Sequence, residues 1–243
     1  GYNKLTVKII SAVIALLIPI ILYGFNFNSI AFDRSLYKEE FSKHKVYTSL
    51  KNYDAEKIND EVLNYLKNGK NNNLIKNDFF NEREKQHLLD VRSLVQGVLL
   101  IYYFSITLFL LSTIMLFLLM DFNFRAIFKK LSIILAFGSL LAFLGAGSAY
   151  LLSSLNFNFA FDAFHKTFFS PGTYLFNPQF EGIVVLYPEN LFFDLLVRII
   201  FGIIFSSVIL LFFPPILFFI FFKEKFPNFS KNFPSRKAKK QKL

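Results

Sequence analysis

The stretch SLVQGVLLIYYFSITLFLLSTIMLFLLM, residues 93–120, runs for 28 residues without a charged side chain. A helix needs about 20 consecutive apolar residues to cross the roughly 30 Å hydrocarbon core of a bilayer. This stretch is therefore long enough and apolar enough to form a membrane-spanning helix.

Three further stretches have the same character. Residues 9–32 contain no charge in 24 positions, residues 131–156 contain none in 26, and residues 195–222 contain only Arg198, near their start. The chain of 243 residues is 54% hydrophobic and includes 35 phenylalanines, which is more apolar surface than a water-soluble domain can bury. The sequence predicts an all-α membrane protein with four transmembrane helices, the first of which is an uncleaved signal-anchor.

The distribution of basic residues predicts the orientation. Residues 223–243 hold eight Lys or Arg against one acid, residues 121–130 hold three basic residues, and the N-terminus holds two lysines. These segments share one side if the four spans alternate, and an excess of Lys and Arg marks the cytoplasmic side. We therefore expect both termini in the cytoplasm, and we interpret the basic tail as a topogenic segment rather than a nucleic-acid- or lipid-binding element.

The expected organisation consists of six consecutive parts. They are a first span (1–32), an extracytoplasmic cap (33–92), spans 2 and 3 with a short cytoplasmic loop (93–156), an outer interfacial loop (157–194), a fourth span (195–222) and a basic cytoplasmic tail (223–243).

The cap is expected to be helical. Residues 53–66 place apolar side chains on one helical face and charged side chains on the other. A second helix is expected to begin after Asn81, with Glu84 at the third position as a capping box requires. That helix contains His87 and is expected to continue without a break into the second span.

The second outer loop is dense in phenylalanine between residues 157 and 169, and a turn signal follows at 170–172. Exposure of so many aromatic rings to water would be unfavourable. We expect an aromatic segment of irregular backbone that lies in the interface or dips into the bundle, where protein or water satisfies its backbone polar groups.

The chain has three histidines and no cysteine. The absence of cysteine excludes disulfides and thiol nucleophiles, and imidazole is the only side chain whose ordinary pKa lies near 6.5. His87 and His165 lie next to the membrane in the two outer loops, so together they suggest proton transfer on a lipid-embedded substrate. Glu84 and Asp90 each lie three residues from His87, so either carboxylate could orient its ring.

The remaining charged candidates have simpler interpretations. His44 is expected to be a solvated loop residue. Asp194 and Arg198 are spaced i, i+4 at the outer end of the fourth span, and we expect a salt bridge between them.

A metal centre is the alternative for the histidine pair. Glu84 precedes His87 and Asp162 precedes His165 with the same acid-x-x-His spacing, which di-iron helical bundles also use. The spans offer no further acidic residues to complete such a site, although a zinc site of two histidines and one carboxylate stays open. We predict no metal.

Three blocks of sequence resemble a known family. The resemblance covers nearly the whole chain and rests on Asn52-Tyr53, on Glu84-x-x-His87-x-x-Asp90-Val91-Arg92, and on Phe164-His165-x-x-Phe168-Phe169 with Tyr174-x-Phe176 and Tyr187-Pro188-Glu189-x-x-Phe192-Phe193-Asp194. These blocks are similar to the four-span membrane proteins that include the bacterial lipoprotein intramolecular transacylases. This chain has Tyr174 where the family usually has tryptophan.

The resemblance implies a reaction. Such enzymes move the sn-2 acyl chain of a diacylglyceryl-cysteine lipoprotein to the α-amine of the same cysteine, and their two outer-face histidines are the catalytic pair. It implies His87 and His165 as catalytic residues, with Arg92 and Tyr174 beside Glu84 and Asp90 in support. We expect no cofactor, a lipoprotein substrate in membrane lipid, and a monomer.

The roles within the pair stay open. We favour His165 as the base on the amine and His87 as the donor to the oxyanion or the leaving oxygen. A metal-assisted interfacial hydrolase and a non-catalytic membrane protein that binds a partner are the alternatives.

Overall fold

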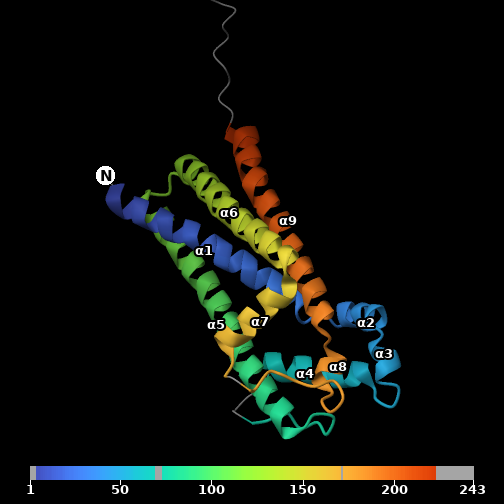
Figure 1. Ribbon diagram of the computed structural model, residues 1–243. Coiled ribbons are helices and arrows are strands. Elements are labelled where there is room, and N and C mark those ends of the chain that lie inside the picture. The colour runs from blue at the N-terminus through green and yellow to red at the C-terminus, as the bar shows by residue number, and fades with distance from the viewer. Residues whose placement is uncertain (1–3, 69–72, 171, 223–243) are drawn as a thin grey trace, which may run out of the picture.

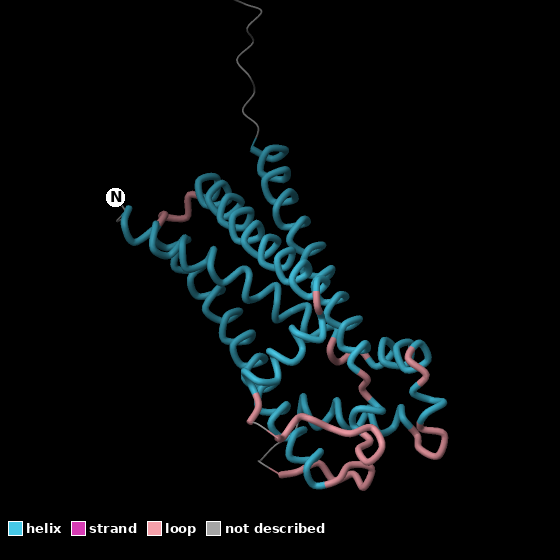
Figure 2. The backbone as a smooth tube through the Cα atoms, in the orientation of Figure 1, coloured by secondary structure: helices cyan, strands magenta, loops and turns pink. Residues whose placement is uncertain are grey.

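The computed structural model describes residues 4–68, 73–170 and 172–222. Within these residues the chain forms helices joined by loops and contains no strand (Figure 2). The basic tail, from which we predicted a cytoplasmic C-terminus, lies outside the described residues.

Four helices are long and apolar enough to cross a membrane, which confirms the prediction of an all-α fold with four spans. They are α1 (Lys4–Ile30), α5 (Glu82–Leu119), α6 (Phe124–Leu155) and α9 (Glu189–Phe222). The first helix packs against all three others, while α6 and α9 pack against each other along their length (Figure 1). Because α5 contacts α6 only weakly, α1 is the element that joins α5 to the α6–α9 pair.

The crossing of α1 and α6 depends on a small residue and a freed carbonyl. Pro19 lies inside α1 and has no N–H, so the carbonyl of Ala15, four residues earlier, loses its helical donor. That carbonyl faces Gly138 of α6, where an added Cβ would lie only 2.7 Å from its oxygen. Close to this crossing, the hydroxyl of Tyr23 donates to the carbonyl of Ala142 at 3.2 Å.

The cap consists of α2 (Arg34–Lys43), α3 (Val46–Ser49), α4 (Ala55–Asn68) and α8 (Ile183–Leu186). A shared apolar core joins these helices to the N-terminal ends of α5 and α9. The helix predicted at residues 53–66 is confirmed as α4. The capping box of Asn81 and Glu84 is also confirmed, and α5 continues from it as one helix of 38 residues.

The aromatic outer segment differs from the prediction. Residues 157–168 are not irregular but form α7 (Phe157–Phe168), whose first turn is capped by the side chain of Asn156. Repeated phenylalanines obscured the helical period, because both the inner and the outer face of this helix carry aromatic rings. Phe159 and Phe168 expose 71% and 54% of their surface, as expected for rings that face lipid.

The predictions of a solvated His44 and of a salt bridge between Asp194 and Arg198 are wrong. His44 ends α2 and keeps only 15% of its side chain exposed, because its ring turns inward to Asp194 of α9. Arg198 binds Glu39 and Glu40 of α2 rather than Asp194. Contacts between α2 and α9, which are distant in sequence, replace the local i, i+4 pair.

We expect Gly138→Ala to weaken the α1–α6 crossing, because the new methyl group would lie 2.6 Å from Ile18 Cδ1 and 2.7 Å from the backbone of Ala15. Such overpacking costs about 1–3 kcal/mol. Thermal unfolding in detergent, followed by circular dichroism, should show a lower midpoint. Gly147→Ala in the same helix is the control, since nothing lies within 4 Å of its added Cβ. Equal midpoints for both variants would contradict the crossing.

Candidate active site

The first turns of α5 project out of the membrane. A helix of 38 residues is about 57 Å long, whereas the hydrocarbon core is roughly 30 Å thick. The charge-free part begins at Ser93, so residues 82–92, with their charged side chains, lie outside the membrane-spanning segment. His87 is within this projecting part, one turn and a half before the apolar stretch.

His87 is enclosed by aromatic rings. Only 7% of its surface is exposed, and its Nδ1 is buried without a hydrogen-bond partner. The ring centroids of Phe169 and Phe176 lie 4.8 Å and 5.3 Å from that of His87. Burial, with a smaller contribution from the charge of His165, lowers the pKa of His87 from 6.5 to about 4. The imidazole is therefore neutral at physiological pH.

Neither carboxylate predicted to orient His87 does so. Both oxygens of Glu84 accept backbone N–H groups, Oε2 from Asn81 and Oε1 from Ile183, each at 2.7 Å. Asp90 accepts a long bond of 3.4 Å from Gln86. Glu84 instead joins the start of α5 to the start of α8, 99 residues away in the sequence.

His165 lies on α7 and is only partly buried. Its Nδ1 is 2.7 Å from the carbonyl oxygen of Phe161 in the preceding helical turn. A carbonyl oxygen can only accept, so Nδ1 carries the proton and the neutral ring keeps its lone pair on Nε2. The carboxylate of Asp162, which shares the acid-x-x-His spacing, pairs with Lys166 instead, at 2.6 Å.

The structure brings the two histidines together. Their ring centroids are 6.1 Å apart and the ring planes are inclined by only 20°. Phe169 lies against both rings, and Tyr174 lies 5.3 Å from His165. The separation is too long for direct hydrogen bonding but short enough for one small group to contact both imidazoles.

Arg92 occupies a different place from the pair. Its guanidinium lies over the ring of Tyr65 at 5.0 Å, and its surface is 93% buried against α4. Among the residues predicted to support the site, Tyr174 therefore contacts His165 directly, whereas Glu84 and Arg92 hold the surrounding elements together.

Sequence reasoning missed Arg83 and Glu181. The guanidinium of Arg83 donates to Glu181 Oε2 at 2.6 Å and to the carbonyl of Leu175 at 2.9 Å, and it covers the ring of Phe176 at 4.8 Å. Burial raises the pKa of Glu181, but the bonds from Arg83 and the backbone N–H of Asn177, together with the charge of Arg83, lower it overall. Arg83 thus fastens the segment that carries Tyr174 and Phe176. A pair separated by 98 residues has no local sequence signature.

The arrangement is suited to proton transfer in a water-poor setting. One imidazole has a lone pair fixed on Nε2, and the other stays neutral because it is desolvated. Aromatic side chains exclude water around both, which strengthens any hydrogen bond formed there.

A family model described as lipoprotein intramolecular transacylase Lit matches residues 11–193. No curated protein sequence matches the chain. Among solved structures, the membrane-integral lipoprotein intramolecular transacylase Lit from Bacillus cereus is similar with a TM-score of 0.76 at 19% identity, covering 88% of this chain and 97% of that one.

Two variants of the same Bacillus cereus protein, with a histidine replaced by arginine or by alanine, each match with a TM-score of 0.70 at 19% identity. They cover 87% of this chain and 91% and 93% of their own chains. At this identity, the structural likeness establishes a shared fold.

We expect Arg83→Ala to loosen residues 173–183. The buried carboxylate of Glu181 would lose its charged donor and keep the backbone N–H of Asn177, which costs about 1–3 kcal/mol of local opening free energy. Hydrogen–deuterium exchange should accelerate in this segment. Lys85→Ala is the control, because Lys85 pairs with Glu82 on its own helix. Unchanged exchange in Arg83→Ala would contradict the proposed fastening.

We expect acid to destabilise the protein partly through His87. Above pH 6.5 the residue is neutral in both states. Between pH 6.5 and about 4, His87 takes up a proton in the unfolded chain but not in the folded site. The free energy of unfolding therefore decreases by up to about 3 kcal/mol as the pH is lowered through this range. The unfolding midpoint should drop less in His87→Gln than in the unsubstituted protein from pH 7.5 to 5. If the unfolding midpoints of the two proteins decreased equally with decreasing pH, burial of His87 would have no such effect.

Proposed function

The chain belongs to the lipoprotein intramolecular transacylase family of membrane-integral acyltransferases, and we propose that it transfers the sn-2 acyl chain of a diacylglyceryl-cysteine lipoprotein to the α-amine of that cysteine. The observation that carries the proposal is the pair of imidazoles 6.1 Å apart, one of them with a lone pair fixed on Nε2.

The reaction moves one acyl group within one molecule. The amine nitrogen attacks the ester carbonyl carbon and forms a tetrahedral centre. The new C–N bond is then kept and the bond to the sn-2 oxygen breaks, which leaves an amide and a free hydroxyl. Since nucleophile and electrophile are already joined, the enzyme gains most by orienting them and by moving one proton.

His165 is suited to be the base. An α-amine has an ordinary pKa of about 8 and must give up a proton to form a neutral amide. The bond from Nδ1 to the Phe161 carbonyl leaves Nε2 as the acceptor and holds the ring in one orientation. The same Nε2 can return that proton to the sn-2 oxygen as it leaves, so the proton count balances.

His87 is suited to stabilise the oxyanion. Because desolvation lowers its pKa to about 4, it is a neutral hydrogen-bond donor rather than a source of protons. A neutral imidazole in an apolar enclosure can stabilise developing negative charge on the carbonyl oxygen. This division of roles agrees with our expectation from sequence.

The position of the pair suits a substrate held in lipid. His87 lies just before the apolar stretch of α5, and α7, which carries His165, exposes phenylalanines of the kind that embed in an interface. We propose that the site faces the outer leaflet, with both termini in the cytoplasm, and that the chain acts as a monomer.

The geometry favours acyl transfer over metal-assisted hydrolysis at this pair. Glu84 is committed to two backbone N–H groups and Asp162 to Lys166. The carboxylates that the acid-x-x-His spacing would supply as ligands are therefore used elsewhere.

We expect His87→Ala and His165→Ala each to lower the rate of N-acyl lyso-lipoprotein formation by about 100-fold to 10,000-fold. The assay uses the purified full chain in nanodiscs with a synthetic diacylglyceryl-cysteine peptide, and mass spectrometry distinguishes N-acylated product from isomeric substrate by its fragments. Lys166→Ala is the control on α7. The ammonium of Lys166 pairs with the partly exposed carboxylate of Asp162. Unimpaired conversion by both histidine variants would refute the proposal.

A further inference from the structure

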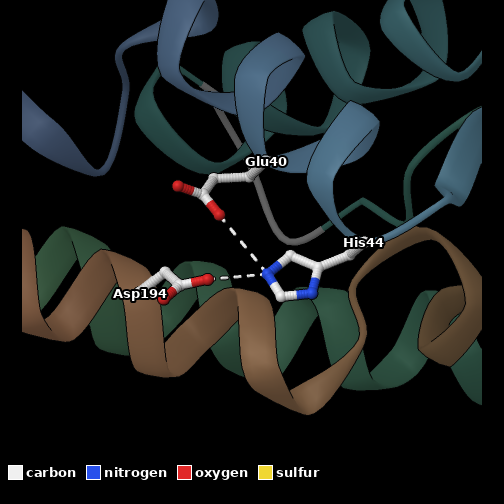
Figure 3. Close-up of side chains that lie close together, drawn as sticks. All are labelled: Glu40, His44 and Asp194. Atoms are coloured by element: carbon white, nitrogen blue, oxygen red, sulfur yellow. Dashed lines mark hydrogen bonds and ion pairs between the residues drawn. The ribbon is translucent and has the colours of Figure 1, made fainter.

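A second cluster of titratable side chains joins the cap to the fourth span. Figure 3 shows Glu40 of α2 and Asp194 of α9 directed at the ring of His44, which caps the end of α2. The Nε2 atom of His44 lies 2.7 Å from Asp194 Oδ2 and 3.4 Å from Glu40 Oε2. These residues are separate from the histidine pair, which lies on α5 and α7.

Glu40 is the unusual member of this cluster. Its side chain is only 1% exposed, and its Oε2 is buried without a hydrogen-bond donor. The other oxygen, Oε1, accepts from Arg198 at 3.2 Å. A desolvated carboxylate oxygen without a donor is costly, so its direction toward His44 and Asp194 indicates a place for positive charge.

The three ligand atoms form a set that suits a transition-metal ion. One imidazole nitrogen and two carboxylate oxygens lie within 4.8 Å of one another. Zinc takes this combination of ligands, with bonds of about 2.0–2.2 Å. Tetrahedral placement at such bond lengths separates neighbouring ligand atoms by about 3.4 Å. The distance of 3.4 Å between His44 Nε2 and Glu40 Oε2 already matches that spacing. The distance of 2.7 Å between His44 Nε2 and Asp194 Oδ2 must increase by less than an ångström.

Lys43 is the competitor for this place. Its ammonium lies 2.7 Å from Asp194 Oδ2 and 3.9 Å from Glu40 Oε2, on a side chain that is 55% exposed and can turn out to solvent. Three carboxylates, those of Glu39, Glu40 and Asp194, gather here. A divalent ion together with Arg198 would balance them with His44 neutral, as a metal ligand must be. Lys43 and Arg198 balance them only if His44 also carries a proton.

We propose that Glu40, His44 and Asp194 bind a divalent transition-metal ion of the zinc class, which displaces the ammonium of Lys43 and leaves further coordination to water. The ion fastens α2 to α9 and so anchors the cap to the outer end of the fourth span. Its role is structural, and it is independent of the acyl-transfer chemistry.

The experiment measures zinc binding directly. The full chain, purified with a tag that lacks histidine and stripped with a chelator, is titrated with ZnCl₂ at pH 7.5 by isothermal calorimetry, and bound zinc is counted by mass spectrometry of the metal. We expect one ion per chain and a higher unfolding midpoint, with no comparable effect of MgCl₂, because magnesium prefers an all-oxygen octahedral set.

Two substitutions move the affinity in opposite directions. His44→Gln should weaken zinc binding at least about 100-fold, since even outer-shell partners of a metal are worth about 10- to 100-fold. Lys43→Gln removes the competing ammonium while keeping the ligands, so it should bind zinc several-fold more tightly. The double variant His87→Ala/His165→Ala should retain one ion per chain.

Three results would overturn the proposal. The first is a chain that binds no zinc although its circular dichroism shows it folded. The second is zinc that remains in His44→Gln but is lost from the His87→Ala/His165→Ala variant, which would assign the ion to the other histidines. The third is an affinity that Lys43→Gln leaves unchanged or lowers, which would show the cluster to be an ion-pair network only.

Discussion

The buried carboxylate of Glu84 is the interaction on which the candidate site depends. It accepts one backbone N–H at the start of α5 and another at the start of α8, so it fixes two segments that are 99 residues apart. Arg83, the preceding residue, adds bonds to Glu181 and to the carbonyl of Leu175. Through these two side chains the start of a rigid helix organises the loop that closes over His87. Without Arg83, the segment that carries Tyr174 and Phe176 would lose these contacts with α5.

One physical cause, desolvation, explains several properties of the site. The enclosure by Phe169 and Phe176 keeps His87 neutral, and the same loss of water would strengthen the hydrogen bond that we propose it donates to an oxyanion. A neutral donor and a base with a fixed lone pair are sufficient for an intramolecular transfer that needs no external nucleophile. In the proposed reaction, two imidazoles carry the proton transfer and stabilise the oxyanion, and no thiol is needed. At the other end of the cap, the charges between α2 and α9 hold the same assembly to the fourth span.

The sequence was sufficient to predict the spans, the capping box at Asn81 and the continuous helix through His87, because charge-free length and local capping patterns are properties of neighbouring residues. It also singled out His87 and His165, whose ring centroids lie 6.1 Å apart in the structure. It was insufficient for Glu84, whose second partner is the backbone of Ile183 and therefore leaves no trace in residue identity. It was misleading for His44, since only the fold brings Asp194 of α9 beside it. Long-range contacts, unlike helical periods, are encoded in no single stretch.

The central claim is that both imidazoles act on one reacting centre. A double-mutant cycle tests it most directly, with single-turnover transacylation rates measured for the unsubstituted chain, His87→Ala, His165→Ala and the double variant. Residues that act as a unit are strongly non-additive. We expect the double variant to be about as slow as the slower single variant. Losses that multiply fully, as for two independent sites, would contradict it.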